Sequence, residues 1–263
     1  MEQDGKKVHQ VSSDILSISA SAEFAPSLFS LKLKGQEWLD TSFPTPGPKS
    51  WWKPWIGGIY TTPEHIAMNS ILKEKYKVYF VKKSDNFGNE WEGISIKMKI
   101  EESEKYKGLI FEQLFLIQAG VPVLLHTTRI WQNTGRLFKG EPFETGHFIK
   151  PEVDIKDCSF ISKNRVGETM VHKAGIRATD YSPKSQIVFA GENQADYLQV
   201  FTPGRKTWKW LCPDLFVMNA WIGDNITSEA GEERYLPNRF YIFTDEILED
   251  AMMQDLKNIK FEI

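Results

Sequence analysis

Apolar and polar residues alternate along most of this chain. The clearest example is the segment 94–100, in which Ile94, Ile96 and Met98 alternate with serine and lysine. Side chains of a strand point alternately to its two faces, so this pattern predicts a strand with one buried and one exposed face. Further strands are expected at residues 16–21, 29–33, 76–81, 109–117, 123–131, 186–190, 198–202 and 239–244.

Turns that contain glycine separate several of these segments, at residues 34–35, 85–89, 119–120, 134–135 and 203–204. The segment 245–256 instead carries apolar residues at helical spacing, behind an aspartate that can cap a helix. The sequence has no internal repeat and no linker long enough to divide it. The expected architecture is all-β: a large antiparallel β-sandwich, formed as a single domain by residues 1–263, with one short C-terminal helix packed on the sheet.

Composition narrows the classes of function. The net charge is -3, with 25% charged and 41% hydrophobic residues, which is the balance of a globular protein. This charge argues against nucleic-acid binding, which needs a basic face. No apolar run approaches the roughly 20 residues of a membrane span. The polar N-terminus lacks the apolar core of a signal peptide, which predicts a cytoplasmic protein, although a fragment of a longer chain would begin in the same way.

The sequence predicts neither a metal site nor a cofactor. The two cysteines, Cys158 and Cys212, are far apart and have no partner motif, so neither a disulfide nor a zinc site is expected. Nucleophile elbows, phosphate-binding loops and dinucleotide fingerprints are absent from the sequence as well.

Three of the nine tryptophans lie within residues 51–55, shortly before the pair Gly57-Gly58. The preceding segment 43–48 is rich in proline, and Pro54 lies among the tryptophans. Because proline removes a backbone donor and fixes φ, the segment is expected to form a rigid loop rather than a strand or helix. Such a loop presents indole faces on which a sugar ring can stack; the alternative is that these tryptophans pack in the core.

Histidines are the next candidates for chemistry. His65 follows the aromatic segment, next to Glu64, and His147 lies in the segment 145–148, which is typical of a turn leading into a strand. Loop histidines close to tryptophans can donate hydrogen bonds to sugar hydroxyls or act as general acids. His126 is expected inside a strand, on the face opposite Arg129, as a partly buried structural residue.

Two other tryptophan segments fit either a binding face or the core. Trp208 and Trp210 alternate with basic residues, which places both indoles on one face of a strand. Trp221 lies between Asn219 and Gly223 in a largely apolar segment and is equally open to both interpretations.

Several short motifs occur in an order known from one family. Residues 24–31 and 34–39 resemble the first hairpin of galactose mutarotase-like proteins, the aldose 1-epimerase superfamily. The segment 53–59, Lys-Pro-Trp-Ile-Gly-Gly-Ile, resembles the family's sugar-anchoring loop. Residues 129–135, the pair His147-Phe148 and the turn at 229–232 resemble later motifs. The resemblance implies a large antiparallel β-supersandwich with a sugar-binding cleft on a concave face.

Two departures from the family pattern concern catalysis. Ile56 stands where the family's loop carries a sugar-anchoring arginine, and residues 216–221 contain no carboxylate where the family has its general base. Mutarotation needs a base at the anomeric hydroxyl and an acid at the ring oxygen. By the resemblance, His65 and His147 correspond to the family's two histidines, but the missing base predicts weak or absent mutarotase activity.

The first hypothesis is therefore a carbohydrate-binding domain whose partner is a mono- or oligosaccharide. The residues expected to contact the sugar are Trp52, Trp55, Glu64, Arg129 and Trp221, with His65 and His147 as candidate catalytic groups. A second hypothesis is an active epimerase with a relocated base, for which the candidates are Asp224, Glu229 and Glu112. An accessory domain of a lyase or hydrolase and a non-catalytic structural module are further alternatives. The sequence specifies neither the sugar nor the oligomeric state.

Overall fold

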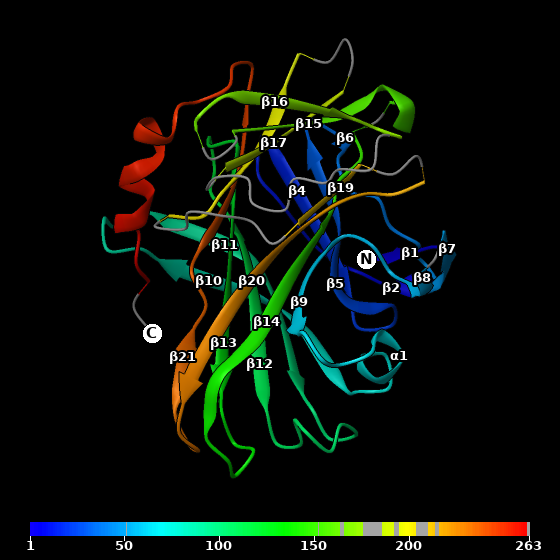
Figure 1. Cartoon of the computed structure of the whole chain (residues 1–263), viewed down its shortest axis with the longest axis vertical. Coiled ribbons are helices and arrows are strands. Elements are labelled where there is room, and N and C mark those ends of the chain that lie inside the picture. Colours follow the sequence, from blue (N-terminus) through cyan, green and yellow to red (C-terminus); the bar gives the residue numbers. More distant parts are fainter. Residues whose placement is uncertain are drawn as a thin grey trace.

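Two large antiparallel sheets make up most of the protein (Figure 1). The structure is a computed structural model that describes residues 1–50, 52–151, 153–163, 166–175, 186–191, 195–203, 210–213 and 216–261. Trp51 and Trp208 lie outside these residues, and Trp210 is described in its backbone only. No helix in the described residues is long and apolar enough to cross a membrane.

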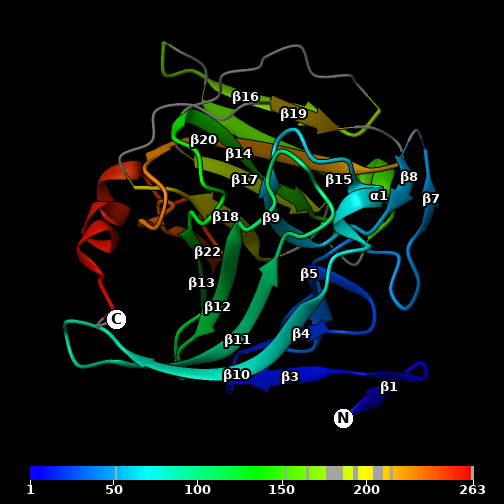
Figure 2. The ribbon, with the colours of Figure 1, turned by 90° about the horizontal axis from the view of Figure 1, so that it is seen from below.

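The larger sheet has ten strands, in the order β10-β11-β12-β13-β22-β18-β17-β15-β16, with β21 paired to β13. Its strands are β10 (Tyr76–Ser84), β11 (Glu90–Lys99), β12 (Ile110–Ile117), β13 (Val123–Trp131), β15 (Cys158–Lys163), β16 (Thr169–Lys173), β17 (Gln186–Gly191), β18 (Tyr197–Phe201), β21 (Glu233–Tyr235) and β22 (Arg239–Thr244). In Figure 2 this sheet curves from β10 through β13 and β22 to β18 along one side of the molecule.

The smaller sheet has eight strands, in the order β19-β20-β14-β9-β5-β4-β3, with β6 paired to β5. Its strands are β3 (His9–Ser12), β4 (Leu16–Ser21), β5 (Ala25–Leu33), β6 (Gln36–Glu37), β9 (Ile59–Pro63), β14 (Phe138–Phe148), β19 (Trp210–Pro213) and β20 (Met218–Ser228). Outside the two sheets are the hairpins β1 (Glu2–Gln3) with β2 (Lys6–Lys7) and β7 (Gly47–Lys49) with β8 (Trp52–Trp55), and the helices α1 (Met68–Ile71), η1 (Ile155–Asp157) and η2 (Asp250–Asn258).

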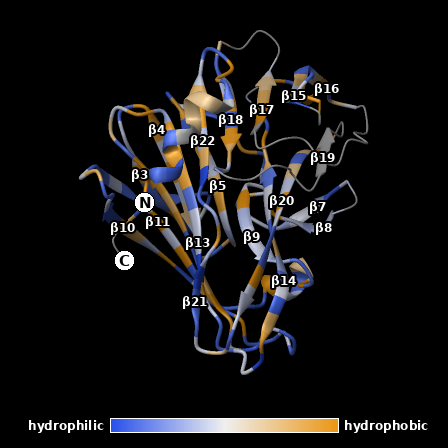
Figure 3. Cartoon of the chain, turned by 60° about the vertical axis from the view of Figure 1, so that its left-hand side comes forward, coloured by the Kyte–Doolittle hydropathy of each residue, from blue (hydrophilic) through white to orange (hydrophobic). Residues whose placement is uncertain are grey.

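The main hydrophobic core lies between the two sheets. Ile94 and Phe115 of the larger sheet and Ile59 and Ile222 of the smaller sheet are all buried in one cluster. Hydrophobic and hydrophilic residues alternate along many strands in Figure 3, because each strand turns one face to this core and the other outward. The alternation seen in the sequence therefore reflects real faces of both sheets.

The predicted all-β fold is confirmed, and every strand predicted from alternation is present. The C-terminal helix is also present, but as a 3-10 helix that begins at Asp250 rather than at residue 245. Met253 on this helix, together with Leu248 and Leu256, packs on the outer face of the larger sheet. Figure 1 shows η2 in red on one flank of the molecule, with α1 and the β7–β8 hairpin on the opposite flank.

Two local predictions were wrong. The tryptophan segment is not a loop without strands, because Trp52–Trp55 forms β8 and pairs with β7. Proline cannot donate a ladder hydrogen bond, so within sheets it is confined to edge strands and bulges. Pro54 fits this rule because the β7–β8 hairpin has only two strands and its register is irregular. The segment 145–148 is not a turn either, because it is the last part of the long strand β14.

Candidate functional site

Aromatic side chains gather next to the β7–β8 hairpin on the outer face of the smaller sheet. The indoles of Trp52 and Trp221 are stacked, with ring centroids 5.9 Å apart and 13° between their planes. The Trp52 ring also meets Phe148 nearly at right angles, at 5.6 Å between centroids. Trp55 and Trp221 are buried, whereas Trp52 is half-buried. Of the three tryptophans expected to contact a sugar, only Trp52 keeps a substantial part of its surface in solvent.

Gly146 explains why the sequence 145–148 can continue as a strand. It is the register partner of Trp221 across β14 and β20. A Cβ at Gly146 would lie 2.8 Å from the nearest atom of the Trp221 ring, so only glycine leaves room for the indole. Glycine inside a strand often marks such a close approach. The glycine that resembled a turn in the sequence is therefore a packing requirement of the aromatic cluster.

The smaller sheet separates His147 from these tryptophans. His147 and Phe148 are neighbours on β14, so their side chains point to opposite faces of the sheet. Phe148 packs in the aromatic cluster with Trp221 on the outer face. The His147 ring is buried between the sheets, with its centroid 5.7 Å from that of Tyr241. The candidate stacking residues and this candidate catalytic residue thus lie on two sides of one sheet.

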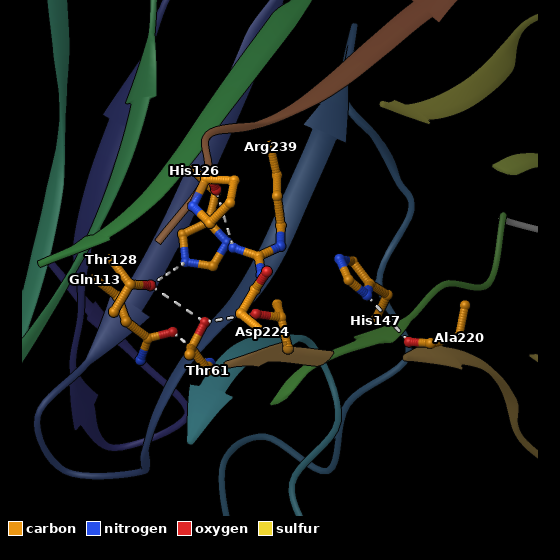
Figure 4. A network of polar contacts seen from close by, with 10 residues as sticks. Thr61, Gln113, His126, Thr128, His147, Ala220, Asp224 and Arg239 are labelled. Atoms are coloured by element: carbon orange, nitrogen blue, oxygen red, sulfur yellow. Dashed lines mark hydrogen bonds and ion pairs between the residues drawn. The ribbon is translucent and has the colours of Figure 1, made fainter. Parts of the chain in front are cut away.

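Between the sheets, polar side chains from both sides form what we call the polar layer (Figure 4). Its members, all buried, are Thr61, Gln113, His126, Thr128, Thr145, His147, Asp224 and Arg239. Along the inner face of β13, for example, Leu124 and Ile130 stand on either side of His126 and Thr128. These two apolar residues belong to different buried clusters. The polar layer is therefore enclosed between two hydrophobic clusters.

Hydrogen bonds within the polar layer join the two sheets. The Thr128 hydroxyl donates to Thr61 Oγ1 at 3.2 Å, and the Thr61 and Thr145 hydroxyls are 2.8 Å apart. The Gln113 Oε1 accepts from the Thr61 backbone N–H at 2.6 Å. Its Nε2 donates to the carbonyl oxygen of Pro26 at 3.1 Å. Buried side-chain amides and hydroxyls are stabilising only when paired in this way.

An ion pair between Arg239 and Asp224 also spans the polar layer. Arg239 is on β22 of the larger sheet and Asp224 on β20 of the smaller one, and their side chains are 0% and 5% exposed. The Arg239 Nη1 also donates to the Pro237 carbonyl oxygen at 3.3 Å. Asp224 was one candidate for a relocated base, and the structure places it in contact with a guanidinium.

Burial and the charge of Arg239 keep both histidines of the polar layer neutral. Burial first, and Arg239 second, lower the pKa of His147 to about 3. The same two causes, with His147 as a third, hold the pKa of His126 well below its ordinary value. The His147 Nδ1 lies 3.0 Å from the Ala220 carbonyl oxygen. Because a carbonyl oxygen only accepts, this nitrogen carries the proton.

These lowered pKa values predict that the protein loses stability in mild acid. Below about pH 6.5 the unfolded chain protonates each imidazole, whereas the folded chain keeps His147 neutral down to about pH 3. The free energy of unfolding should therefore fall by about 1.4 kcal/mol per pH unit for each buried histidine. Urea unfolding between about pH 7 and pH 4 measures this slope. The variant His147→Gln should show a smaller slope, and a slope unchanged from the wild type would contradict the prediction.

The variant His65→Gln is the matched control for this pH dependence, because the His65 imidazole is exposed.

Glu64 and His65 lie between β9 and α1, and α1 contacts β8, which carries Trp52. The Glu64 backbone N–H donates to the Pro142 carbonyl oxygen at 3.0 Å and fixes the start of this segment. Three of the predicted residues, Trp52, Glu64 and His65, are thus carried by neighbouring segments on one flank.

Arg129 lies on a different surface, the outer face of the larger sheet. Its Nε and Nη2 donate to the two carboxylate oxygens of Glu233 at 2.7 and 2.6 Å. Its guanidinium is 4.2 Å from the centroid of Trp131.

His126 is on the opposite face of β13, as predicted from parity. Glu112 shares the outer face with Arg129, and Glu229 lies in the exposed turn before β21.

Sequence reasoning did not identify Arg239 as a member of any site. Arg239 precedes Phe240 in a strand whose alternation points Arg239, Tyr241 and Phe243 to the same face. That pattern contained a signal: an arginine on the core face needs a buried carboxylate as its partner. The sequence did not show which carboxylate, because Asp224 belongs to the other sheet.

Solved structures with the same arrangement identify the fold. A protein from Synechocystis sp. PCC 6803 matches with a TM-score of 0.61 and 10% identity, over 92% of this chain and 97% of that chain. A galactose mutarotase related enzyme from Lactobacillus acidophilus matches with a TM-score of 0.56 and 8% identity, over 89% of this chain and 97% of that chain. This chain has the galactose mutarotase-like fold. The resemblance inferred from short motifs is confirmed at the level of the fold.

The same fold occurs as part of longer sugar-active proteins. The α-galactosidase from Lactobacillus brevis matches with a TM-score of 0.56 and 9% identity, over 92% of this chain. This chain spans only 40% of that α-galactosidase. No protein-family model and no curated protein sequence matches the chain.

Proposed function

We propose that this chain is a carbohydrate-binding domain in which Trp52 is the stacking surface for a sugar ring. The observation that carries the proposal is the half-buried Trp52 indole, held parallel to Trp221 at the rim of the aromatic cluster. A rigid indole loses little conformational entropy when a ligand stacks on it. Trp55 and Trp221 support the cluster from within rather than contacting the ligand.

Polar side chains near this indole would supply the hydrogen bonds. His65 is exposed, Glu64 is partly exposed, and both precede the helix that packs beside β8. An imidazole and a carboxylate together offer donors and acceptors for neighbouring sugar hydroxyls. The fold supports a sugar as the ligand, since the matched structures include a galactose mutarotase related enzyme and an α-galactosidase.

Calorimetric titration with a panel of neutral mono- and oligosaccharides tests the proposal. The wild type should bind at least one of them, and Trp52→Ala should raise its Kd at least about tenfold, which is about 1.4 kcal/mol. The matched control is Phe87→Ala, because Phe87 is an exposed aromatic residue on the β10–β11 turn, away from the aromatic cluster. Absence of binding at millimolar sugar, or an equal loss in both variants, would refute the proposal.

An epimerase with a relocated base is the second candidate, and the polar layer favours it. His126 and His147, whose pKa values are both lowered, lie there beside the Asp224–Arg239 ion pair, and buried histidines with perturbed pKa values next to charged groups are frequent at active sites. His126 Nδ1 and the Tyr241 hydroxyl are buried without a hydrogen-bond partner among the described residues. Because the polar layer is enclosed, a sugar would reach it only after the apolar clusters separate. Polarimetry on freshly dissolved glucose and galactose decides: a rate equal to the uncatalysed background excludes this candidate.

A further inference from the structure

The outer face of the larger sheet carries a row of charged residues in register. Lys77 of β10 is the partner of Lys97 on β11, and Lys97 is the partner of Glu112 on β12. Glu112 is in turn the partner of Arg129 on β13, which pairs with Tyr235 on β21. Register partners point to the same face of a sheet. The residues of β11 that point the other way, such as Ile96, are buried in the core, so the whole row faces outward.

The acidic groups of this face are already engaged. Glu112 is 7% exposed, and its carboxylate accepts hydrogen bonds from the Ser95 hydroxyl at 2.6 Å and from the Tyr79 hydroxyl. Glu233 receives two hydrogen bonds from Arg129. Neither carboxylate forms an ion pair with a lysine of the row in the described part of the chain. Neither carboxylate therefore neutralises the positive charge of Lys77 and Lys97, which is available to an anionic ligand.

Lys77 and Lys97 stand directly opposite each other, which is an unfavourable arrangement for like charges. Within the described ranges neither lysine has an ion-pair partner, and the Lys97 Nζ instead lies 4.3 Å from the centroid of Trp131. Lys77 is exposed and Lys97 partly so. An anionic group between the two ammonium groups would remove the repulsion and gain attraction from both.

Aromatic rings lie beside the lysines. Trp131 is partly exposed, with the guanidinium of Arg129 4.2 Å from its centroid. Tyr235 is 42% exposed, and its hydroxyl donates to Glu233 Oε1 at 2.7 Å, which fixes the position of the ring. A sheet face that combines fixed aromatic rings with ammonium groups that have no carboxylate partner among the described residues is complementary to a ligand with flat apolar faces and negative charge.

We propose that this face binds an acidic saccharide, a chain of sugars that carries carboxylate groups. The carboxylates would lie on Lys77 and Lys97, and a sugar ring would stack on Tyr235 beside Trp131. The rings favour a saccharide over an acidic peptide, because the C–H face of a sugar ring covers an aromatic side chain. The face belongs to the larger sheet, whereas Trp52 lies outside the smaller one, so this proposal does not depend on the function proposed above.

Titration with an oligogalacturonate, a neutral malto-oligosaccharide of equal length and polyglutamate tests the proposal in low salt and at about 0.15 M salt. We expect oligogalacturonate to bind more tightly than the other two, and more weakly at the higher salt. The double variant Lys77→Gln/Lys97→Gln should raise its Kd about tenfold. Trp131→Ala and Tyr235→Ala should weaken binding at both salt concentrations.

The control is the double variant Lys32→Gln/Lys34→Gln, which removes two exposed lysines from the smaller sheet and its adjoining turn. It has the same net charge as the test variant and should bind like the wild type. Equal weakening in both double variants would show unspecific attraction and overturn the proposal. Polyglutamate binding as tight as oligogalacturonate binding, or no binding of oligogalacturonate to the wild type, would overturn it as well.

Discussion

The variant Arg239→Met is expected to lower the free energy of unfolding by about 3–5 kcal/mol. Arg239 is fully buried, and its partner Asp224 has only 5% of its side chain exposed. Removing the guanidinium leaves a carboxylate in the interior without its counter-charge, and water cannot reach it to compensate. Urea unfolding at neutral pH, followed by tryptophan fluorescence or circular dichroism, measures the change.

Two further variants separate the lost ion pair from lost packing. The double variant Arg239→Met/Asp224→Val removes both charges, and it should be clearly more stable than Arg239→Met alone. Arg129→Met removes an arginine from the half-exposed pair with Glu233, whose side chains are 25% and 30% exposed, and it should cost less than about 1 kcal/mol. If Arg239→Met cost no more than Arg129→Met, the buried pair would not have the importance assigned to it.

The variant Gly58→Ala is expected to destabilise the protein by about 2–5 kcal/mol. Gly58 has φ +74, and a Cβ there would lie 2.1 Å from the Leu28 carbonyl oxygen on the neighbouring strand β5. The backbone cannot move away easily. The Gly58 N–H donates to the Asp40 carbonyl oxygen at 2.8 Å, and its own carbonyl accepts from the Phe148 N–H at 3.0 Å. Both the positive φ and the collision with backbone atoms therefore oppose any side chain.

The matched control is Gly35→Ala. Gly35 also has a positive φ, +91, but no atom lies within 4 Å of a Cβ built on it. Its replacement should cost only the conformational term, about 1–2 kcal/mol. Thermal or urea unfolding of the two variants compares them directly. Equal losses at both positions would mean that the close approach of Leu28 to Gly58 is relieved by a small backbone shift.

The glycine pair in the aromatic segment shows how a sequence motif and a structural cause can be related. The motif was interpreted as part of a sugar-anchoring loop, by resemblance. The structure gives Gly58 a separate reason, the close approach of its backbone to Leu28 at the point where β9 pairs with β5. This packing reason holds whether or not a sugar binds at Trp52, so the glycine pair by itself does not distinguish binding from scaffolding.

Predicting the site was harder than predicting the fold, and the reason is visible on β14. His147 and Phe148 are adjacent in sequence, and the sequence grouped His147 with Trp52 and Trp221 in one candidate sugar site. In the folded chain the sheet lies between His147 and both tryptophans. Closeness along a strand brings neighbouring side chains to opposite faces, so a sequence motif of adjacent residues does not make a site by itself.

The sequence by itself determined the strands in which apolar and polar residues alternate, the faces of β11 and β13, the presence of a C-terminal helix and, through short motifs, the fold, but it did not predict β9, β14 or β20. Alternation is a local property, because each residue's face depends only on its position in its own strand. Only the tertiary structure decided that Arg239 meets Asp224, that Trp52 stays partly exposed while Trp55 does not, and that Lys77 faces Lys97. These outcomes depend on the register between strands and on the packing of one sheet on the other, which link residues far apart in the chain.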